Sequence, residues 1–221
     1  MIFYIAIAGS ISWIIAYVLI ARKGFKDKSY GMPLVPLALN FAWELVYSFM
    51  FREYPSNVFV LFNPIWAALD LVIIWTFFKY GYPYFKSAFH LSKIEFYSLS
   101  IVCFVVSILI MIYAPDFFKG ISITKGDKLE TTSFMAAFEN IIISVCYVLM
   151  YFQRRNSQGQ SFLIALFKFL VPVSGIISYL PIHFHPFMVI VYAVVVTFDV
   201  WYMILIYKQL KSEGHNPWIH L

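Results

Sequence analysis

The side chains best suited to acid–base chemistry lie inside apolar stretches. Four carboxylic acids occupy long hydrophobic runs: Glu44 in NFAWELVY, Asp70 in WAALDLVI, Glu139 in FENIIIS and Asp199 in TFDVWYMIL. Burying an unpaired carboxylate costs much free energy, because desolvation penalises the charged form. Lys168 is the one cation inside such a run. It can neutralise at most one acid, or it can extend toward the end of its helix. We therefore expect most of these acids to be neutral and able to protonate a bound substrate.

The elements that must position these acids are membrane-spanning helices. Hydrophobic residues make up 62% of the 221 residues and charged residues only 12%, whereas soluble domains carry roughly 25% charged residues. Crossing a bilayer needs about 17–25 mostly apolar residues, and several runs reach that length. The sequence predicts an all-α fold, a polytopic membrane protein that forms one seven-transmembrane-helix bundle over residues 1–221. The expected spans are 1–21, 34–51, 58–78, 97–114, 134–152, 161–180 and 187–207. The longest connection, 115–133, is expected to form a small lid or a hairpin.

Basic residues predict how the bundle is oriented in the membrane. Eleven Lys and Arg residues fall in the loops of one side and the C-terminal tail, and four fall in the loops of the other side. The positive-inside rule then places the C-terminus in the cytoplasm and the N-terminus outside or in a lumen. This distribution does not indicate a nucleic-acid surface, so no nucleic-acid partner is expected.

Helix geometry predicts that three of the acids lie near the middle of the membrane. With a rise of about 1.5 Å per residue, Glu44 lies ~10 Å from the outer end of its span, and Asp70 and Asp199 lie ~18 Å from theirs. Glu139 lies only ~8 Å deep on the same scale. We expect the inward faces to form a pocket with polar groups at mid-depth and aromatic walls. Side chains one turn from the acids are Asn40, Tyr47, Trp66 and Tyr202. A plainer interpretation is that each acid ties two helices together through hydrogen bonds.

Other reactive patterns are weak or missing. The sequence has no Asp-Asp-x-x-Asp pair to hold the metal that ionises a prenyl diphosphate, so we expect no metal and no cofactor. It has no GxSxG or HExxH hydrolase motif either. Cys103 and Cys146 are expected to be small apolar residues without a disulfide. His183 and His185 in HFHP are expected to belong to a polar loop.

The four acid-bearing motifs and the seven-span frame resemble a known family. They are similar to the small integral-membrane terpene cyclases of fungal meroterpenoid and indole-diterpene pathways and their bacterial relatives. The resemblance implies that Glu44 and Asp199 protonate the substrate. It also implies that Asp70 and Asn140 are further polar positions of the family.

Three functions are compatible with these features. The first is a membrane terpene cyclase that protonates a terminal epoxide or alkene of a lipophilic prenylated substrate and guides carbocation cyclisation without metal. Glu44 and Asp199 would be the acids. The supporting polar residues would be Asp70, Asn40, Asn140 and Glu139, and the cation-stabilising rings would be Trp43, Tyr47, Trp66, Trp201 and Tyr202. The second is a proton-coupled transporter or proton relay using the same carboxyl groups. The third is a structural subunit whose acids bind partner helices.

Overall fold

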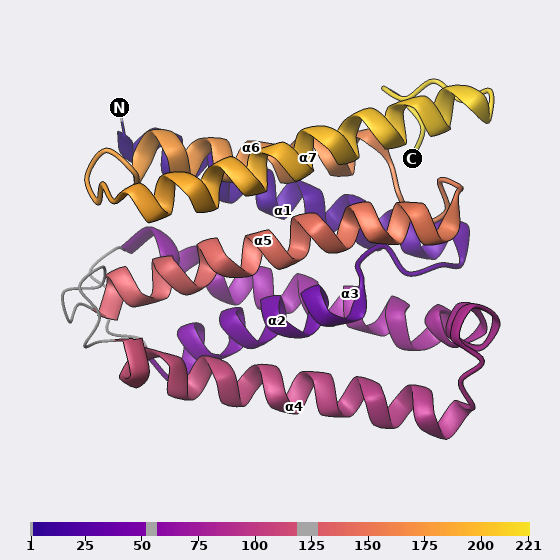
Figure 1. Cartoon of the computed structure of the whole chain (residues 1–221), viewed down its shortest axis with the longest axis horizontal. Coiled ribbons are helices and arrows are strands. Elements are labelled where there is room, and N and C mark those ends of the chain that lie inside the picture. Colours follow the sequence, from indigo (N-terminus) through magenta and orange to yellow (C-terminus); the bar gives the residue numbers. More distant parts are fainter. Residues whose placement is uncertain (1, 52–56, 119–127) are drawn as a thin grey trace.

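A computed structural model describes residues 2–51, 57–118 and 128–221 of the chain. The described residues form seven α-helices joined by short connections, with no strand among them (Figure 1). The helices are α1 (Ile2–Asp27), α2 (Leu34–Phe49), α3 (Asn57–Phe89), α4 (Lys93–Phe118), α5 (Lys128–Arg154), α6 (Phe162–Ser178) and α7 (Pro186–Ser212).

The predicted helical membrane bundle is confirmed, and each expected span corresponds to one helix. Within the described residues, five helices are long and apolar enough to cross a membrane: α1, α3, α4, α5 and α7. The other two, α2 and α6, are apolar but shorter, with 16 and 17 residues. Cys103 and Cys146 are both free thiols, as expected.

One predicted loop is wrong. Residues 79–96 lie between the expected spans 58–78 and 97–114, but the segment KYGYPYFK at their start continues α3 to Phe89, with Pro83 inside the helix. Its Phe85 is buried, with ring centroids 5.7 Å from Phe77 and 5.2 Å from Phe96. This aromatic packing between α3 and α4 stabilises a helical extension that local composition does not predict.

The long connection is also shorter than predicted. Residues 115–118 belong to α4 and 128–133 to α5, so both helices run into the expected loop. The rest of the predicted lid or hairpin lies outside the described residues.

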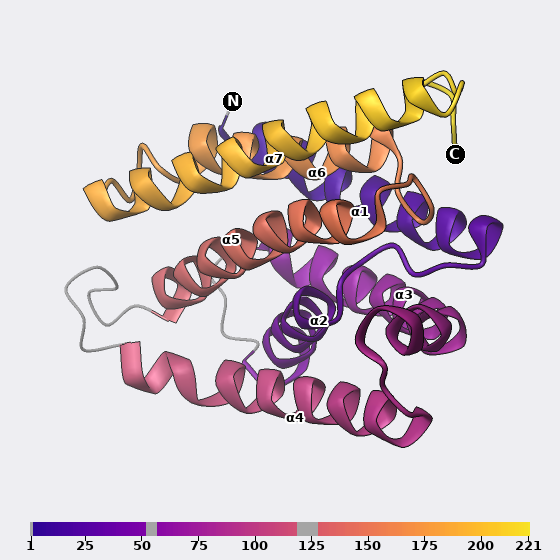
Figure 2. The ribbon, with the colours of Figure 1, turned by 45° about the vertical axis from the view of Figure 1, so that its right-hand side comes forward.

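The helices run roughly along one axis, with α4 and α7 at opposite edges of the bundle (Figures 1 and 2). α1 packs against α6 and α3, and α2 packs between α3 and α4. A small residue brings α1 close to α6, since a Cβ on Gly9 would lie 2.6 Å from the Ser174 Cβ. The N-terminus and the α6–α7 connection lie at one end of the bundle (Figure 1), here called the N-terminal end.

Polar contacts close the opposite end, where the basic loops lie. The Arg154 guanidinium stacks over the Tyr30 ring at 4.0 Å and donates to the Tyr30 carbonyl. Gly159 has φ +70°, and a side chain there would meet the Tyr30 carbonyl, so this tight turn requires glycine. The next residues start α6, where the Ser161 hydroxyl accepts from the Ile164 N–H. Two loops and the start of α6 are thereby fixed together.

Candidate active site

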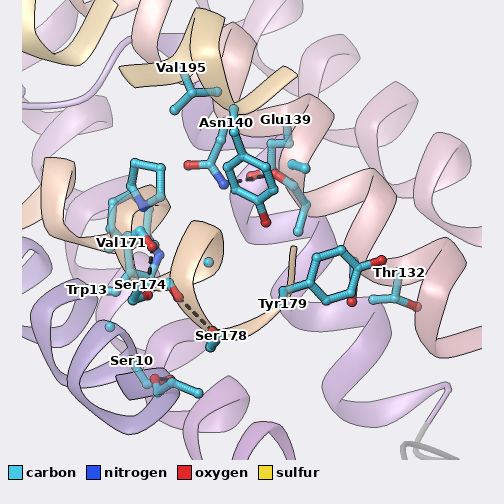
Figure 3. Close-up of a pocket in the computed structure, with 18 of the residues that line it drawn as sticks. Ser10, Trp13, Thr132, Glu139, Asn140, Val171, Ser174, Ser178, Tyr179 and Val195 are labelled. Carbon is cyan, nitrogen blue, oxygen red and sulfur yellow. Dashed lines mark hydrogen bonds between the residues drawn. The ribbon is translucent and has the colours of Figure 1, made fainter. Parts of the chain in front are cut away.

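A cavity of about 450 Å³ lies between the helices (Figure 3), and its lining reaches the start of α1 and the α6–α7 connection at the N-terminal end of the bundle. Its lining residues come from α1, α2, α3, α5, α6, α7 and the α6–α7 connection, and none of them from α4. Its volume falls in the usual range for sites that hold drug-sized ligands. Its walls are mostly apolar, with polar groups at a few points, such as Glu139, Asn140 and Ser174 (Figure 3). Such a cavity suits a largely hydrocarbon guest.

Glu44 lies at the inner part of this cavity and is held on one oxygen only. It is 1% exposed, and its Oε1 accepts hydrogen bonds from the Tyr17 hydroxyl at 2.5 Å and the Asn40 amide at 3.0 Å. The other oxygen, Oε2, is buried and has no hydrogen-bond partner among the described residues. Glu44 is a lining residue, so one oxygen of this carboxyl group is held in place while the other has no donor among the described residues.

Asp70 lies directly behind Glu44. It is fully buried and is not a lining residue. Its Oδ2 accepts from the Asn40 amide at 2.7 Å, and its carboxyl group is within hydrogen-bonding reach of that of Glu44. Asn40 therefore bridges the two acids, with one amide nitrogen near oxygens of both. The sequence-predicted grouping of Glu44, Asp70 and Asn40 is present in the structure.

Glu139 and Asn140 both line the cavity from α5 (Figure 3). The Asn140 amide donates to the Ala136 carbonyl at 2.8 Å, one turn earlier on the same helix. Glu139 is 5% exposed and is an electrostatic neighbour of Glu44. The cavity therefore receives two carboxyl groups, but from α2 and α5 rather than from α2 and α7.

Asp199 does not share the cavity with Glu44, contrary to expectation. It forms an ion pair with Lys168, and both side chains are at most 2% exposed. The Lys168 ammonium also donates to the Ser144 hydroxyl at 2.8 Å, so the cluster joins α5, α6 and α7. Lys168 was expected either to neutralise one acid or to extend toward the end of its helix, and the structure shows the first. Asp199 is absent from the described lining residues, because its face of α7 packs against α5 and α6.

The predicted aromatic walls are present in part. Trp43 and Trp66 line the cavity, and their indole N–H groups donate to the Thr132 and Ser10 carbonyls. The other three rings lie elsewhere. Tyr47 donates to the Met111 carbonyl, Tyr202 donates to the Gln160 side chain, and Trp201 is 44% exposed beside Phe152.

Sequence reasoning missed several residues of the site. Tyr17, which holds Glu44, and Trp13, which lines the cavity, lie one turn apart on α1 with ring centroids at 4.9 Å. Their four-residue spacing on an apolar span could have indicated an inward face. Asn63 also lines the cavity. It lies two turns before Asp70 on α3, a spacing that places both on the same side of the helix.

Comparisons with known proteins agree with the resemblance. The family model of Pyr4-like transmembrane terpene cyclases matches residues 2–213. The chain is 32% identical over 157 residues to the Pyr4-family terpene cyclase mfmH of Annulohypoxylon moriforme, covering 70% of this chain and 60% of that protein. It is 28% identical over 179 residues to the terpene cyclase ascF of Acremonium egyptiacum, covering 76% and 63%. The matches thus span less than two thirds of each of these relatives. No solved structure matches the chain.

Proposed function

Because the chain belongs to the Pyr4-like transmembrane terpene cyclases, we propose that it cyclises a lipophilic prenylated substrate inside the membrane. The reaction starts when a carboxylic acid protonates a terminal epoxide or alkene of the substrate. Family membership favours this function over the transporter and the structural subunit. The substrate partitions into the lipid, and no metal is required for the acid step.

The observation that carries the proposal is the arrangement of Glu44. Tyr17 and Asn40 hold its Oε1, while Oε2 has no partner among the described residues of a carboxyl that lines the cavity. Two adjacent carboxyl groups in a dry site disfavour full ionisation of both. Glu44 and Asp70 therefore retain a proton between them. Glu44 delivers it to the substrate, and Asp70 supports its protonation without touching the substrate.

The steps balance as an isomerisation. Glu44 transfers its proton to the epoxide oxygen, the carbon–oxygen bond breaks, and a carbocation forms at the more substituted carbon. Neighbouring double bonds of the substrate attack in turn and form carbon–carbon bonds. Loss of a proton from the last cation gives an alkene and returns the proton to a carboxylate. Both Glu44 and Glu139 face the cavity and can accept it.

The walls of the cavity suit the cationic intermediates. Trp13, Trp43 and Trp66 all line it, and each aromatic face can attract a desolvated cation with about 2 kcal/mol. The apolar lining also keeps water away from the cation, which would otherwise be quenched early. The ion pair of Asp199 with Lys168 favours a positioning role for Asp199, because it fixes α7 against α6 rather than facing the substrate.

The placement of the Lys and Arg residues further supports a topology with the N-terminus outside the cell or in a lumen. The N-terminal end of the cavity lining then lies toward that side.

The test is cyclisation of a prenylated terminal epoxide by membranes that carry the protein, with products separated by mass spectrometry. Glu44→Gln keeps the shape of the side chain but removes the acidic proton. Since general acid catalysis contributes about 10²–10⁴-fold, turnover should fall by at least a hundredfold. Glu95→Gln is the control, because Glu95 is exposed and caps α4 outside the cavity. Full turnover by Glu44→Gln would refute the assignment.

A further inference from the structure

Asn63 is a polar residue of the cavity that the acid chemistry does not use. It is 1% exposed and lines the cavity from α3. Its Oδ1 is buried and has no hydrogen-bond partner among the described residues. A buried amide oxygen left without a partner costs free energy. Retaining one on a cavity wall indicates that a ligand supplies the missing hydrogen.

Asn63 lies nearer the N-terminal end of the bundle than Asp70 does. It is two turns from Asp70 on the same helix, which corresponds to about 10 Å, and Asp70 adjoins Glu44. The side chains between the two levels are rings such as Trp13 and Trp66, and both line the cavity. The cavity therefore offers polar groups at its inner part and again nearer the N-terminal end, with tryptophan rings on its wall.

A second polar group lines the cavity from α7. Tyr192 on α7 lines the cavity, and its hydroxyl lies against Gly175 on α6. A Cβ on residue 175 would come within 2.8 Å of that hydroxyl, so glycine leaves the space that the Tyr192 side chain occupies. Gly175 lies next to Ser174, which faces Gly9 of α1. The Tyr192 hydroxyl therefore lies on the cavity wall beside the contact between α1 and α6.

The cavity wall also carries an aromatic surface. Tyr179 and His183 both line the cavity near the α6–α7 connection. Their rings are stacked, with centroids 4.6 Å apart and an interplanar angle of 21°. Figure 3 shows Tyr179 and Ser178 on the cavity wall away from Asn140. A flat ring of a ligand can lie against such a surface.

From this arrangement we infer that Asn63 and Tyr192 form a subsite for an oxygen-bearing head group of the substrate. This inference rests on the proposed function and adds the direction of binding. The isoprenoid chain enters first and its reactive end reaches Glu44. A hydroxyl of the head group donates to Asn63 Oδ1, a second oxygen accepts from the Tyr192 hydroxyl, and the ring of the head group lies toward Tyr179 and His183.

The experiment measures binding separately from catalysis. Purified protein carrying Glu44→Gln is titrated with two probes, and tryptophan fluorescence is recorded. Both are isoprenoid terminal epoxides of equal chain length; one ends in a dihydroxyphenyl ring and the other in a plain hydrocarbon. Asn63→Leu should weaken binding of the ring-bearing probe roughly tenfold, which is what one lost hydrogen bond corresponds to. Binding of the hydrocarbon probe should change less than twofold.

A stability measurement excludes a merely structural role. Replacing an unpartnered buried amide with a leucine of similar size removes an unsatisfied oxygen, so the thermal midpoint of the ligand-free protein should stay equal or rise. Tyr192→Phe should act on the ring-bearing probe in the same way. Tyr207→Phe on the same helix, outside the cavity lining, is the matched control and should change neither probe.

Two results would overturn the inference: equal weakening of both probes, or no weakening of the ring-bearing probe by Asn63→Leu. Failure of the proposed function would look different. In that case protein with Glu44 intact would turn over neither probe, or Glu44→Gln would not slow it. The binding difference between the probes would still be measurable.

Discussion

The buried pair of Lys168 and Asp199 allows a direct test of whether Asp199 acts through its charge or through its proton. Lys168→Met removes the cation and leaves an acid that is 1% exposed, with Oδ2 already lacking a partner in the described part of the chain. Breaking such a pair costs about 3–5 kcal/mol. For a chain of this size the thermal midpoint should fall by about 6–20 °C. Asp199→Asn should be destabilised to a similar degree, because it leaves the ammonium unpaired.

The double variant Lys168→Met with Asp199→Asn removes both charges together. Replacing a buried ion pair by neutral groups is often close to neutral for stability, so its midpoint should return to within a few degrees of the wild type. If Asp199 only fixes α7 against α6, the double variant should also regain turnover, to within about tenfold of the wild type.

The assays are thermal unfolding of the purified protein in detergent and turnover of the prenylated epoxide in membranes. Lys208→Met is the control, since Lys208 is an exposed cation on the same helix as Asp199. A double variant that is as stable as the wild type but no faster than Asp199→Asn would refute the positioning role. The carboxyl group of Asp199 would then take part in the chemistry itself.

Three further predictions follow from single contacts. Tyr17→Phe removes the donor at 2.5 Å from Glu44 Oε1, so kcat should fall about tenfold with little change in KM; an unchanged kcat would contradict this role. Gly9→Ala places a Cβ against Ser174 and should cost about 1–3 kcal/mol in thermal unfolding, with recovery when Ser174→Gly is added. Burial alone would raise the pKa of Glu213 at the end of α7, but hydrogen bonds from Ser157 and Gln209 lower it overall. Because the folded pKa is then below the unfolded one, this contribution is present above about pH 4.5 and is lost as the pH falls further. Proteolysis of the tail should therefore speed up at pH 4 relative to pH 7, and Glu213→Gln should remove the difference.

The sequence predicted the helices well because membrane spans are long and their apolar composition is a strong signal. It predicted their ends poorly. The end of α3 depends on Phe85 packing against Phe96 of another helix, and a local pattern does not contain that contact. Asn40 contacts both Glu44 and Asp70. Spacing along α2 indicates the first contact, whereas the second depends on how α2 and α3 pack.

The position of Asp199 could not be derived in the same way. Its partner Lys168 lies on another helix, and the rotation of each helix about its axis decides whether two mid-membrane charges meet. α7 has only a weak polar face, so its sequence does not show which side of the helix faces the cavity. Asn63 escaped notice for a related reason: its importance comes from a missing hydrogen bond, and only coordinates reveal an absent partner.

α4 contributes no residue to the described lining of the cavity, yet it packs against α2, which carries Glu44. Selection on substrate shape therefore acts on the other helices, while α4 is free to diverge as long as it supports α2. Exchanging α4 for that of a relative should give a chimera whose product spectrum is unchanged and whose heat tolerance differs. Differences in product between relatives would then arise from substitutions in the six helices that line the cavity.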